Sequence, residues 1–228
     1  MQARPGALFP PPMKLFQFPR WTDRLRPLLG LALVLTPVYL TVLFAYGASA
    51  ENLNVGYEPE QPVPFSHALH AGELGLDCLY CHNTVEVADH AAIPPASTCM
   101  NCHERIRPES PKLAPVRAAA EGGLPVEWIK VHDLPEYVYF SHAPHVAAGV
   151  SCVECHGRVD WMERVRTVEP LSMSWCLDCH RAPEKHLRPR DLVTDLDWKP
   201  EGDPVELGRR LMAENGIHPR TDCSTCHR

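Results

Sequence analysis

The chain has 228 residues, enough for one or two domains. Charged residues make up 22% and hydrophobic residues 45%, which excludes a disordered tail and a membrane protein with many spans. The net charge is −6 and no block of Lys or Arg occurs, so we expect no nucleic-acid partner.

The first 46 residues predict a membrane anchor. Residues 28–46 (LLGLALVLTPVYLTVLFAY) carry no charge. As a helix, 19 residues extend about 28 Å, close to the roughly 30 Å of a bilayer core. Arg20, Arg24 and Arg26 precede this run and no cation follows it closely, which predicts a cytoplasmic N-terminus. We therefore predict a cytoplasmic tail (1–27), a transmembrane anchor (28–46) in the inner membrane of a bacterium, and a linker (47–64) entering the periplasm.

A cleaved signal peptide is the alternative, because Ala48-Ser49-Ala50 resembles a cleavage site. The apolar run is longer than the usual 7–15 residues of such a peptide, which favours the anchor. Both interpretations export the rest of the chain. Met13 leaves open a later start of translation.

All ten cysteines occur in five C-x-x-C-H motifs, the attachment sequence of c-type haem. Cysteines three positions apart on one helical turn face the same way and bond the two vinyl groups of one porphyrin, while the next residue, His, binds the iron. We therefore predict five haem c groups, with proximal ligands His82, His103, His156, His180 and His227. The covalent attachments are Cys78 and Cys81 (motif 1), Cys99 and Cys102 (motif 2), Cys152 and Cys155 (motif 3), Cys176 and Cys179 (motif 4), and Cys223 and Cys226 (motif 5).

Other uses of C-x-x-C fit less well. Structural zinc needs two such pairs for each ion, and five is an odd number. A disulfide framework does not explain the histidine after every pair. A redox-active pair would be single and set in a βαβ pattern, which the sequence lacks.

The exported part contains a duplication. FSHALH (65–70) precedes motifs 1 and 2, and FSHAPH (140–145) precedes motifs 3 and 4, at offsets of 74 to 77 residues. We predict two dihaem units (65–106 and 138–181), a joining linker (107–137), and a C-terminal segment with the fifth haem (182–228).

Eight histidines remain to supply distal iron ligands. In each H-x-x-H box the two rings diverge enough to serve two haems, so we predict His67, His70, His142 and His145 as distal ligands. The fifth distal ligand stays open between Met173, whose thioether would raise the haem potential, His132 and His90. We expect His186 and His218 to face solvent or haem propionates.

The fold class follows from this count. About 178 residues after Ala50 surround five haems, so porphyrins take the place of a conventional core. We predict a mostly α-helical fold with much irregular structure and few strands, and we expect no folding without haem. The predicted helices are 77–83, 98–105, 151–156, 174–181 and 204–215.

The boxes and motifs resemble those of the class III multihaem cytochromes c. The full layout, which includes IPPASTCMNCH, VHDLPEYVYFSHAPHV and PLSMSWCLDCHR, resembles the membrane-anchored pentahaem cytochrome subunit of alternative complex III. The resemblance implies a quinol-oxidising respiratory complex. Its implied partners are an iron–sulfur subunit, a polytopic quinol-binding subunit and a monohaem cytochrome c.

The favoured function is electron transfer toward a periplasmic cytochrome or oxidase, without a small-molecule substrate or a catalytic residue of its own, because saturated irons leave no substrate site. The alternative is a membrane-anchored quinol dehydrogenase of the NapC/NrfH type. In that type the first haem lies close to the anchor, whereas 31 residues separate Tyr46 from Cys78 here. A haem enzyme such as a multihaem nitrite reductase would need a five-coordinate iron, and all five motifs end in His.

Overall fold

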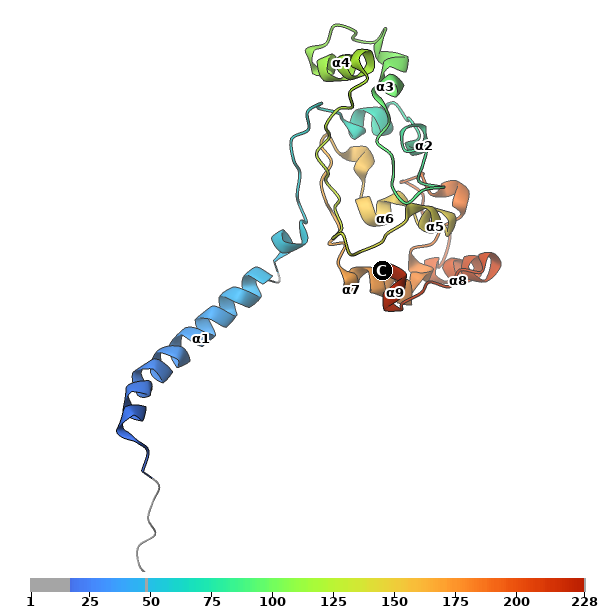
Figure 1. Cartoon of the computed structure of the whole chain (residues 1–228). Coiled ribbons are helices and arrows are strands. Elements are labelled where there is room, and N and C mark those ends of the chain that lie inside the picture. Colours follow the sequence, from blue (N-terminus) through green and yellow to red (C-terminus); the bar gives the residue numbers. More distant parts are fainter. Residues whose placement is uncertain (1–16, 48, 228) are drawn as a thin grey trace, which may run out of the picture. The chain divides into compact units, whose positions relative to one another are not determined.

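The computed structural model describes residues 17–47 and 49–227, in two units that divide between Ser49 and Ala50. Most of the predicted cytoplasmic tail (residues 1–16), Ala48 of the possible cleavage site and Arg228 lie outside the described residues. Each unit is described by itself below (Figure 1).

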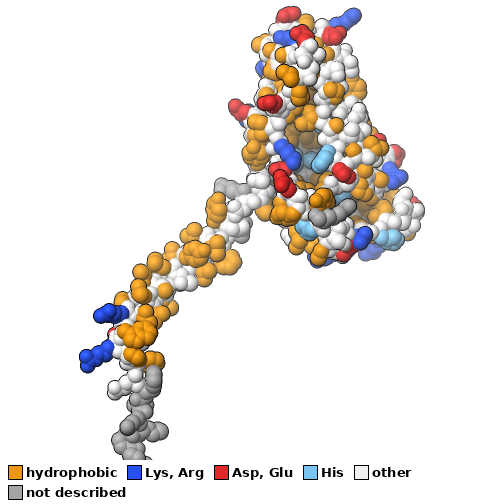
Figure 2. All heavy atoms as spheres, viewed as in Figure 1, with side chains coloured by type: hydrophobic (Ala, Val, Ile, Leu, Met, Phe, Trp, Pro, Cys, Tyr) orange, Lys and Arg blue, Asp and Glu red, His pale blue; other side chains and the backbone are white. Residues whose placement is uncertain are grey.

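The N-terminal unit consists of a 3₁₀ turn, η1 (Arg20–Arg24), and the long helix α1 (Leu25–Gly47). The 23 residues of α1 extend about 34 Å, and none of them is buried. Figure 2 shows apolar side chains along the face of the helix that it presents. An 18-residue window of the segment Arg20–Gly47 has a mean hydropathy of 2.3, and among the described residues this segment is the single candidate for a membrane span. Pro37 lies inside the helix, where the Thr41 hydroxyl donates to its carbonyl at 2.8 Å. The helix begins three residues earlier than predicted.

The second unit is built from short helices and turns joined by irregular segments. The five predicted helices occur as α2, α3, α6, α7 and α8, and the prediction of low strand content is confirmed for the described residues, where an isolated bridge between Val150 and Leu187 is the only strand-like pairing. The elements are η2 (Ala50–Leu53), the π-helical turn η3 (Ala68–Glu73), α2 (Cys78–Cys81), α3 (Ala96–His103), η4 (Pro111–Leu113), α4 (Ala114–Gly122), α5 (His142–Ala147), α6 (Cys152–His156), η5 (Val159–Trp161), α7 (Met173–Arg181), η6 (Pro183–Lys185), η7 (Arg190–Leu192), α8 (Pro204–Asn215) and α9 (Cys223–Cys226).

Local chemistry explains where these helices start and stop. The Asp77 carboxylate caps α2 by accepting from the backbone N–H of Leu79 at 2.7 Å. Helix α8 has the Asp203 carboxylate at its N-cap, proline as its first residue, and Gly216 in the left-handed region (φ +61°) after its last turn. These signals are visible in the sequence, which is why α8 was predicted with its observed bounds.

Three α-helices of this unit, α4, α5 and α9, were not among the predicted helices. Helix α4 lies within the predicted linker 107–137, packs against α3, and buries Val116 and Ala119. The Arg117 guanidinium holds the preceding turn by donating to the carbonyls of Pro108 and Ser110. The rest of the linker is extended, and the Gln61 side chain clamps it by exchanging two hydrogen bonds, each 2.9 Å, with the backbone of Ile129.

The polypeptide supplies almost no core of its own. Among the described residues only seven hydrophobic side chains are buried, and they are scattered rather than clustered in one layer. A soluble domain of this size normally buries a contiguous cluster of large apolar side chains. The buried ones here are Val63, Val85, Val116, Ala119, Met162, Leu187 and Val193.

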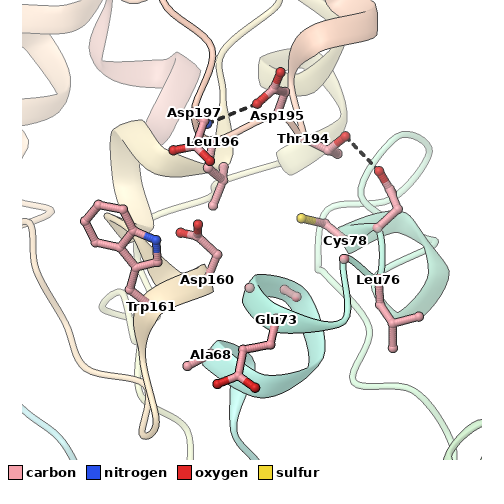
Figure 3. Close-up of a pocket in the computed structure, with 14 residues that line it drawn as sticks. Ala68, Glu73, Leu76, Cys78, Asp160, Trp161, Thr194, Asp195, Leu196 and Asp197 are labelled. Carbon is pink, nitrogen blue, oxygen red and sulfur yellow. Dashed lines mark hydrogen bonds between the residues drawn. The ribbon is translucent and has the colours of Figure 1, made fainter.

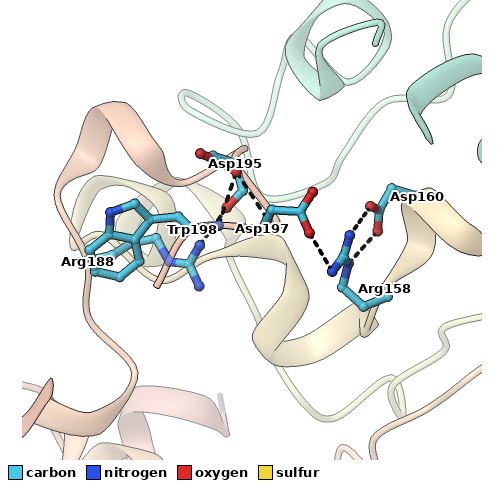
Figure 4. Close-up of polar contacts among 6 residues, drawn as sticks. All are labelled: Arg158, Asp160, Arg188, Asp195, Asp197 and Trp198. Atoms are coloured by element: carbon cyan, nitrogen blue, oxygen red, sulfur yellow. Dashed lines mark hydrogen bonds and ion pairs between the residues drawn. The ribbon is translucent and has the colours of Figure 1, made fainter. Parts of the chain in front are cut away.

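Polar contacts fix the segment after α7 against the rest of the unit (Figure 4). The Arg158 guanidinium pairs with Asp160 and with Asp197, the latter at 2.8 Å. The buried Arg188 guanidinium lies 5.0 Å from the centre of the Trp198 ring and donates to the Asp195 carbonyl at 2.7 Å. These contacts hold the C-terminal segment beside α6 and η5 without much apolar burial.

Gly208 sets the closest helix contact, because a Cβ atom on this residue would lie 1.8 Å from the carbonyl oxygen of Glu184 in η6. We expect Gly208→Ala to destabilise the haem-loaded protein by roughly 3 kcal/mol, since backbone has to move to admit the methyl group. Chemical denaturation measures the change. Gly122→Ala is the matched control: Gly122 also lies in a helix, has open space around it and no positive φ, so a neutral or slightly stabilising change is expected. Equal midpoints for both variants would contradict the close packing of α8.

Candidate functional haem-binding site

Four pairs of histidine rings face each other in the second unit. Each pair joins one histidine of an H-x-x-H box to the histidine of one C-x-x-C-H motif. The ring centroids lie 6.4 Å apart for His67 and His82, 6.2 Å for His70 and His103, 6.3 Å for His142 and His156, and 5.9 Å for His145 and His180.

This spacing fits one metal between two imidazoles. A metal–imidazole bond is about 2 Å long and the ring centre lies about 1 Å beyond the nitrogen, so two rings on opposite sides of one ion have centres about 6 Å apart. Among the described residues no group of three or more His, Cys, Asp or Glu side chains converges as a site for a bare ion. Two facing imidazoles beside a pair of thiols match a haem iron, whose other four ligands come from the porphyrin.

The two boxes have the same internal geometry. Each box phenylalanine meets the first histidine edge-on, with centroids 4.9 Å apart in both copies. Each phenylalanine also lies against the second histidine, at 4.3 Å for Phe65 and 4.7 Å for Phe140. The serine carbonyl of each box accepts from the second histidine, at 2.8 Å for His70 and 2.7 Å for His145. The repeat seen in the sequence is thus a repeat of side-chain placement.

Backbone carbonyls fix the tautomer of most of these histidines. Seven predicted ligands have Nδ1 within 2.7–3.0 Å of a carbonyl oxygen. Because a carbonyl only accepts, Nδ1 carries the proton and the Nε2 lone pair stays available to a metal. The seven, with their acceptors, are His70 (Ser66), His82 (Ala92), His103 (Ile106), His142 (Asp89), His145 (Ser141), His180 (Arg220) and His227 (Tyr137).

Burial keeps the central rings neutral. It lowers the pKa of His156 to about 3, with a further effect from His132, and the pKa of His67 to about 4, with a further effect from His82. Burial also lowers the pKa of His145. A neutral imidazole is the form that binds a metal. Nδ1 of His67 is buried and has no hydrogen-bond partner in the described part of the chain.

The cysteines of the motifs are thiols in this structure. Burial raises the pKa of Cys155 to about 12 and also raises the pKa of Cys81 and Cys99, so these groups are protonated thiols rather than thiolates. All ten cysteines are free of disulfide bonds. Addition of a thiol to a porphyrin vinyl group gives a thioether, which no longer titrates.

Two pockets open beside the first two motifs. An apolar pocket of about 370 Å³ lies next to Cys99 and is walled by Val116 and Trp128. A pocket of about 550 Å³ has Cys78 in its wall and a rim of carboxylates that includes Asp160 (Figure 3). The apolar pocket suits a porphyrin edge, whereas the carboxylates of the second would repel haem propionates.

The three candidates for the fifth distal ligand lie in different places. His132 meets His156, with Nε2 at 3.3 Å from Nδ1 of that ring and centroids 4.4 Å apart. His132 therefore takes the place of the backbone carbonyl that contacts Nδ1 in the other motif histidines. His90 lies in the loop whose Asp89 carbonyl accepts from His142, beside motif 3. Met173 begins α7 and is 67% exposed. The structure brings none of the three into a ring contact with His227.

The role of His132 was missed by reasoning from sequence. Its spacing from any motif gives no signal, because 24 residues separate it from His156. His186 was predicted to face solvent or a propionate, and it instead contacts the Glu154 carboxylate at 2.7 Å, which raises its pKa.

Comparisons with known proteins agree with the haem chemistry. Residues 138–228 match the family described as cytochrome c7 and related cytochrome c. The chain is 31% identical over 128 residues to the menaquinone reductase multihaem cytochrome c subunit of Nitratidesulfovibrio vulgaris (strain Hildenborough). That alignment covers 56% of this chain and 59% of the relative's length. The C-terminal part of the chain is thus similar to cytochromes c of the c7 kind, and about half of the chain is similar to a multihaem cytochrome c subunit.

Proposed function

We propose that this chain is the membrane-anchored pentahaem cytochrome c subunit of a quinol-oxidising respiratory complex of the alternative complex III type. In this proposal α1 anchors the chain in the inner membrane and the haem domain lies in the periplasm. Four facing histidine pairs, in a chain that carries five C-x-x-C-H motifs, are the observation that carries the proposal.

The residues of the chain hold and orient the cofactor. In each of sites 1 to 5, numbered by motif, two cysteines bind the porphyrin edge and the motif histidine binds the iron. His67, His70, His142 and His145 take the distal positions of sites 1, 2, 3 and 4. A bound haem supplies reversible one-electron exchange between ferrous and ferric iron. Two histidines on one iron leave no position for a substrate, which supports a carrier rather than an enzyme.

Met173 is our choice for the distal ligand of site 5. His132 is engaged by His156, and His90 lies beside site 3. Met173 stands one turn before Cys176 on the same face of α7, and Cys176 is close enough to Cys226 of motif 5 for the pKa of its thiol to be raised, after burial, by that neighbour.

The Met173 assignment gives a direct test. Because a thioether raises the potential of a haem, Met173→His is expected to lower the highest midpoint potential in a redox titration. Met173→Leu is expected to leave one iron that binds carbon monoxide when reduced. His90→Ala is the matched control and is expected to bind none. Carbon monoxide binding by the His90 variant, with an unchanged titration in Met173→His, would reverse the assignment.

The relative's name supports a second direction of electron flow. A menaquinone reductase delivers electrons to a quinone, whereas the proposed complex takes them from a quinol. This chain carries electrons between a quinone-reactive subunit and another redox protein in both cases. The proposed partners remain an iron–sulfur subunit, a polytopic quinol-binding subunit and a monohaem cytochrome c.

Purification from native membranes tests the proposal. We expect five haem equivalents by pyridine haemochrome assay, a retained N-terminal anchor by intact mass, and copurifying subunits of the three kinds named. A short-chain quinol should reduce the haems of this complex. Fewer than five haems, or a chain purified alone from solubilised membranes, would contradict it. Reduction of added quinone from the haems, without quinol oxidation, would instead favour the menaquinone reductase direction.

A further inference from the structure

Sites 1 and 2 share one helical turn. His67 and His70, at the start of η3, face the histidines of motifs 1 and 2. The motifs also touch directly, because the side-chain amide of Asn101 donates to the Tyr80 hydroxyl at 3.2 Å. Tyr80 lies inside motif 1 and Asn101 inside motif 2, so the two porphyrin attachment edges are neighbours.

Sites 3 and 4 are joined in the same way. His142 and His145 stand one turn apart on α5 and face the histidines of motifs 3 and 4. Cys155 of motif 3 lies near Cys179 of motif 4, which contributes to the raised pKa of the Cys155 thiol.

The two units meet through sites 1 and 3. The thiols of Cys78 and Cys152, the first cysteines of motifs 1 and 3, lie close enough for each to shift the pKa of the other. The imidazole of His142, the distal residue of site 3, donates to the Asp89 carbonyl at 2.8 Å, seven residues after motif 1. These two contacts, one at the first cysteines and one at the distal histidine of site 3, place site 1 against site 3.

Site 5 continues from site 4. Nδ1 of His180, the motif 4 histidine, donates to the Arg220 carbonyl at 2.8 Å, three residues before Cys223. Helices α7 and α9 also bring Cys176 close to Cys226. Motif 5 is anchored further by the Tyr139 N–H, which donates to the Cys226 carbonyl at 2.8 Å.

Exposure of the cysteines indicates which haem sites have the fewest neighbouring sites. Cys102 of motif 2 and Cys223 of motif 5 are exposed, while the other eight cysteines are partly covered. Within the described residues, the hydrogen bonds and ring contacts of motif 2 to other segments run to Tyr80 and to His70. Figure 1 shows α3, α2 and α6 following one another along the domain, with α7 and α9 at the end opposite α3.

We infer that the five haem sites form a single file in the order 2, 1, 3, 4, 5, so that sites 2 and 3, consecutive in the sequence, are separated by site 1. This inference rests on the proposed binding of five haems. The two dihaem units therefore meet head to head through their first sites, instead of following one another in tandem. Sites 2 and 5 are the two ends, where external redox proteins reach the file.

A structure of the haem-loaded protein in its native complex tests the order directly. We expect the iron of site 2 to have one near iron neighbour, site 1, and the iron of site 1 to have two, sites 2 and 3. A site 2 iron closer to site 3 than to site 1 would overturn the order. Failure of the proposed function is a separate result, because it appears first as fewer than five haem equivalents in the pyridine haemochrome assay.

Removal of single haems tests the order in solution. Cys99→Ser with Cys102→Ser removes site 2, and Cys223→Ser with Cys226→Ser removes the other end as its matched control. Each variant is expected to keep four haems and to change the haem methyl proton NMR shifts of one remaining haem. Cys78→Ser with Cys81→Ser removes site 1 and is expected to change the shifts of two. Changed shifts of two haems after loss of site 2 would contradict the single file.

Discussion

A haem-free preparation of this chain is expected to lack the circular dichroism of the native domain and to be cleaved throughout residues 50–228 by dilute protease. The reason is the small number of buried apolar side chains, seven among the described residues, and their scattered placement. The rings of the four histidine pairs stand about 6 Å apart, the spacing of two imidazoles on one iron, so the fold is built around groups that the haem-free chain lacks. Without porphyrins, burial does not offset the conformational entropy lost on folding.

The measurement is simple to control. The same gene is expressed with and without the cytochrome c maturation machinery, and far-ultraviolet circular dichroism is compared in the same detergent, where the anchor helix contributes equally to both samples. The loaded protein serves as the reference for native helix content. A haem-free chain with native dichroism and a cooperative thermal transition would show that the polypeptide folds alone.

The second large effect is expected at a distal ligand. His142→Ala removes the ring that faces His156 at 6.3 Å with an interplanar angle of 9°. We expect one of the haems to become five-coordinate while staying attached through Cys152 and Cys155. The reduced variant should then bind one equivalent of carbon monoxide, with a shift of the Soret band, and the oxidised variant should show a high-spin ferric EPR signal.

His218→Ala is the matched control for this experiment, because His218 stands outside the four facing pairs. We expect that variant to bind no carbon monoxide and to keep the low-spin spectrum. A His142→Ala protein that remains fully low-spin, with no carbon monoxide binding, would show that the facing pair is not an iron-binding pair.

Motif chemistry was readable from the sequence because it is local. The cysteines and histidine of each C-x-x-C-H motif lie within about one helical turn. The sequence predicted the helices that carry motifs 1 to 4. Local capping signals likewise fixed α8, between Asp203 and Gly216. The apolar run of α1 was visible from hydropathy alone, and the structure extends it by three residues at its start.

The sequence predicted the distal histidines but not their pairing with the proximal ones. The H-x-x-H boxes indicated that His67 and His70 serve two irons, but not which ring faces which motif. That choice depends on how separate helices pack, such as α5 against α6 and α7. Helix α4 escaped prediction for a similar reason: its short Ala-rich segment is marginal alone and is stabilised by packing against α3.

The sequence by itself determined the five C-x-x-C-H motifs and the repeat of the histidine boxes, and it predicted the anchor, because each depends on residues close together in the chain. Tertiary structure alone decided that His132 contacts His156 and that motif 1 lies near motif 3 through Cys78 and Cys152. These are long-range contacts between irregular segments, and no periodicity in the sequence records which of two distant turns will lie against each other.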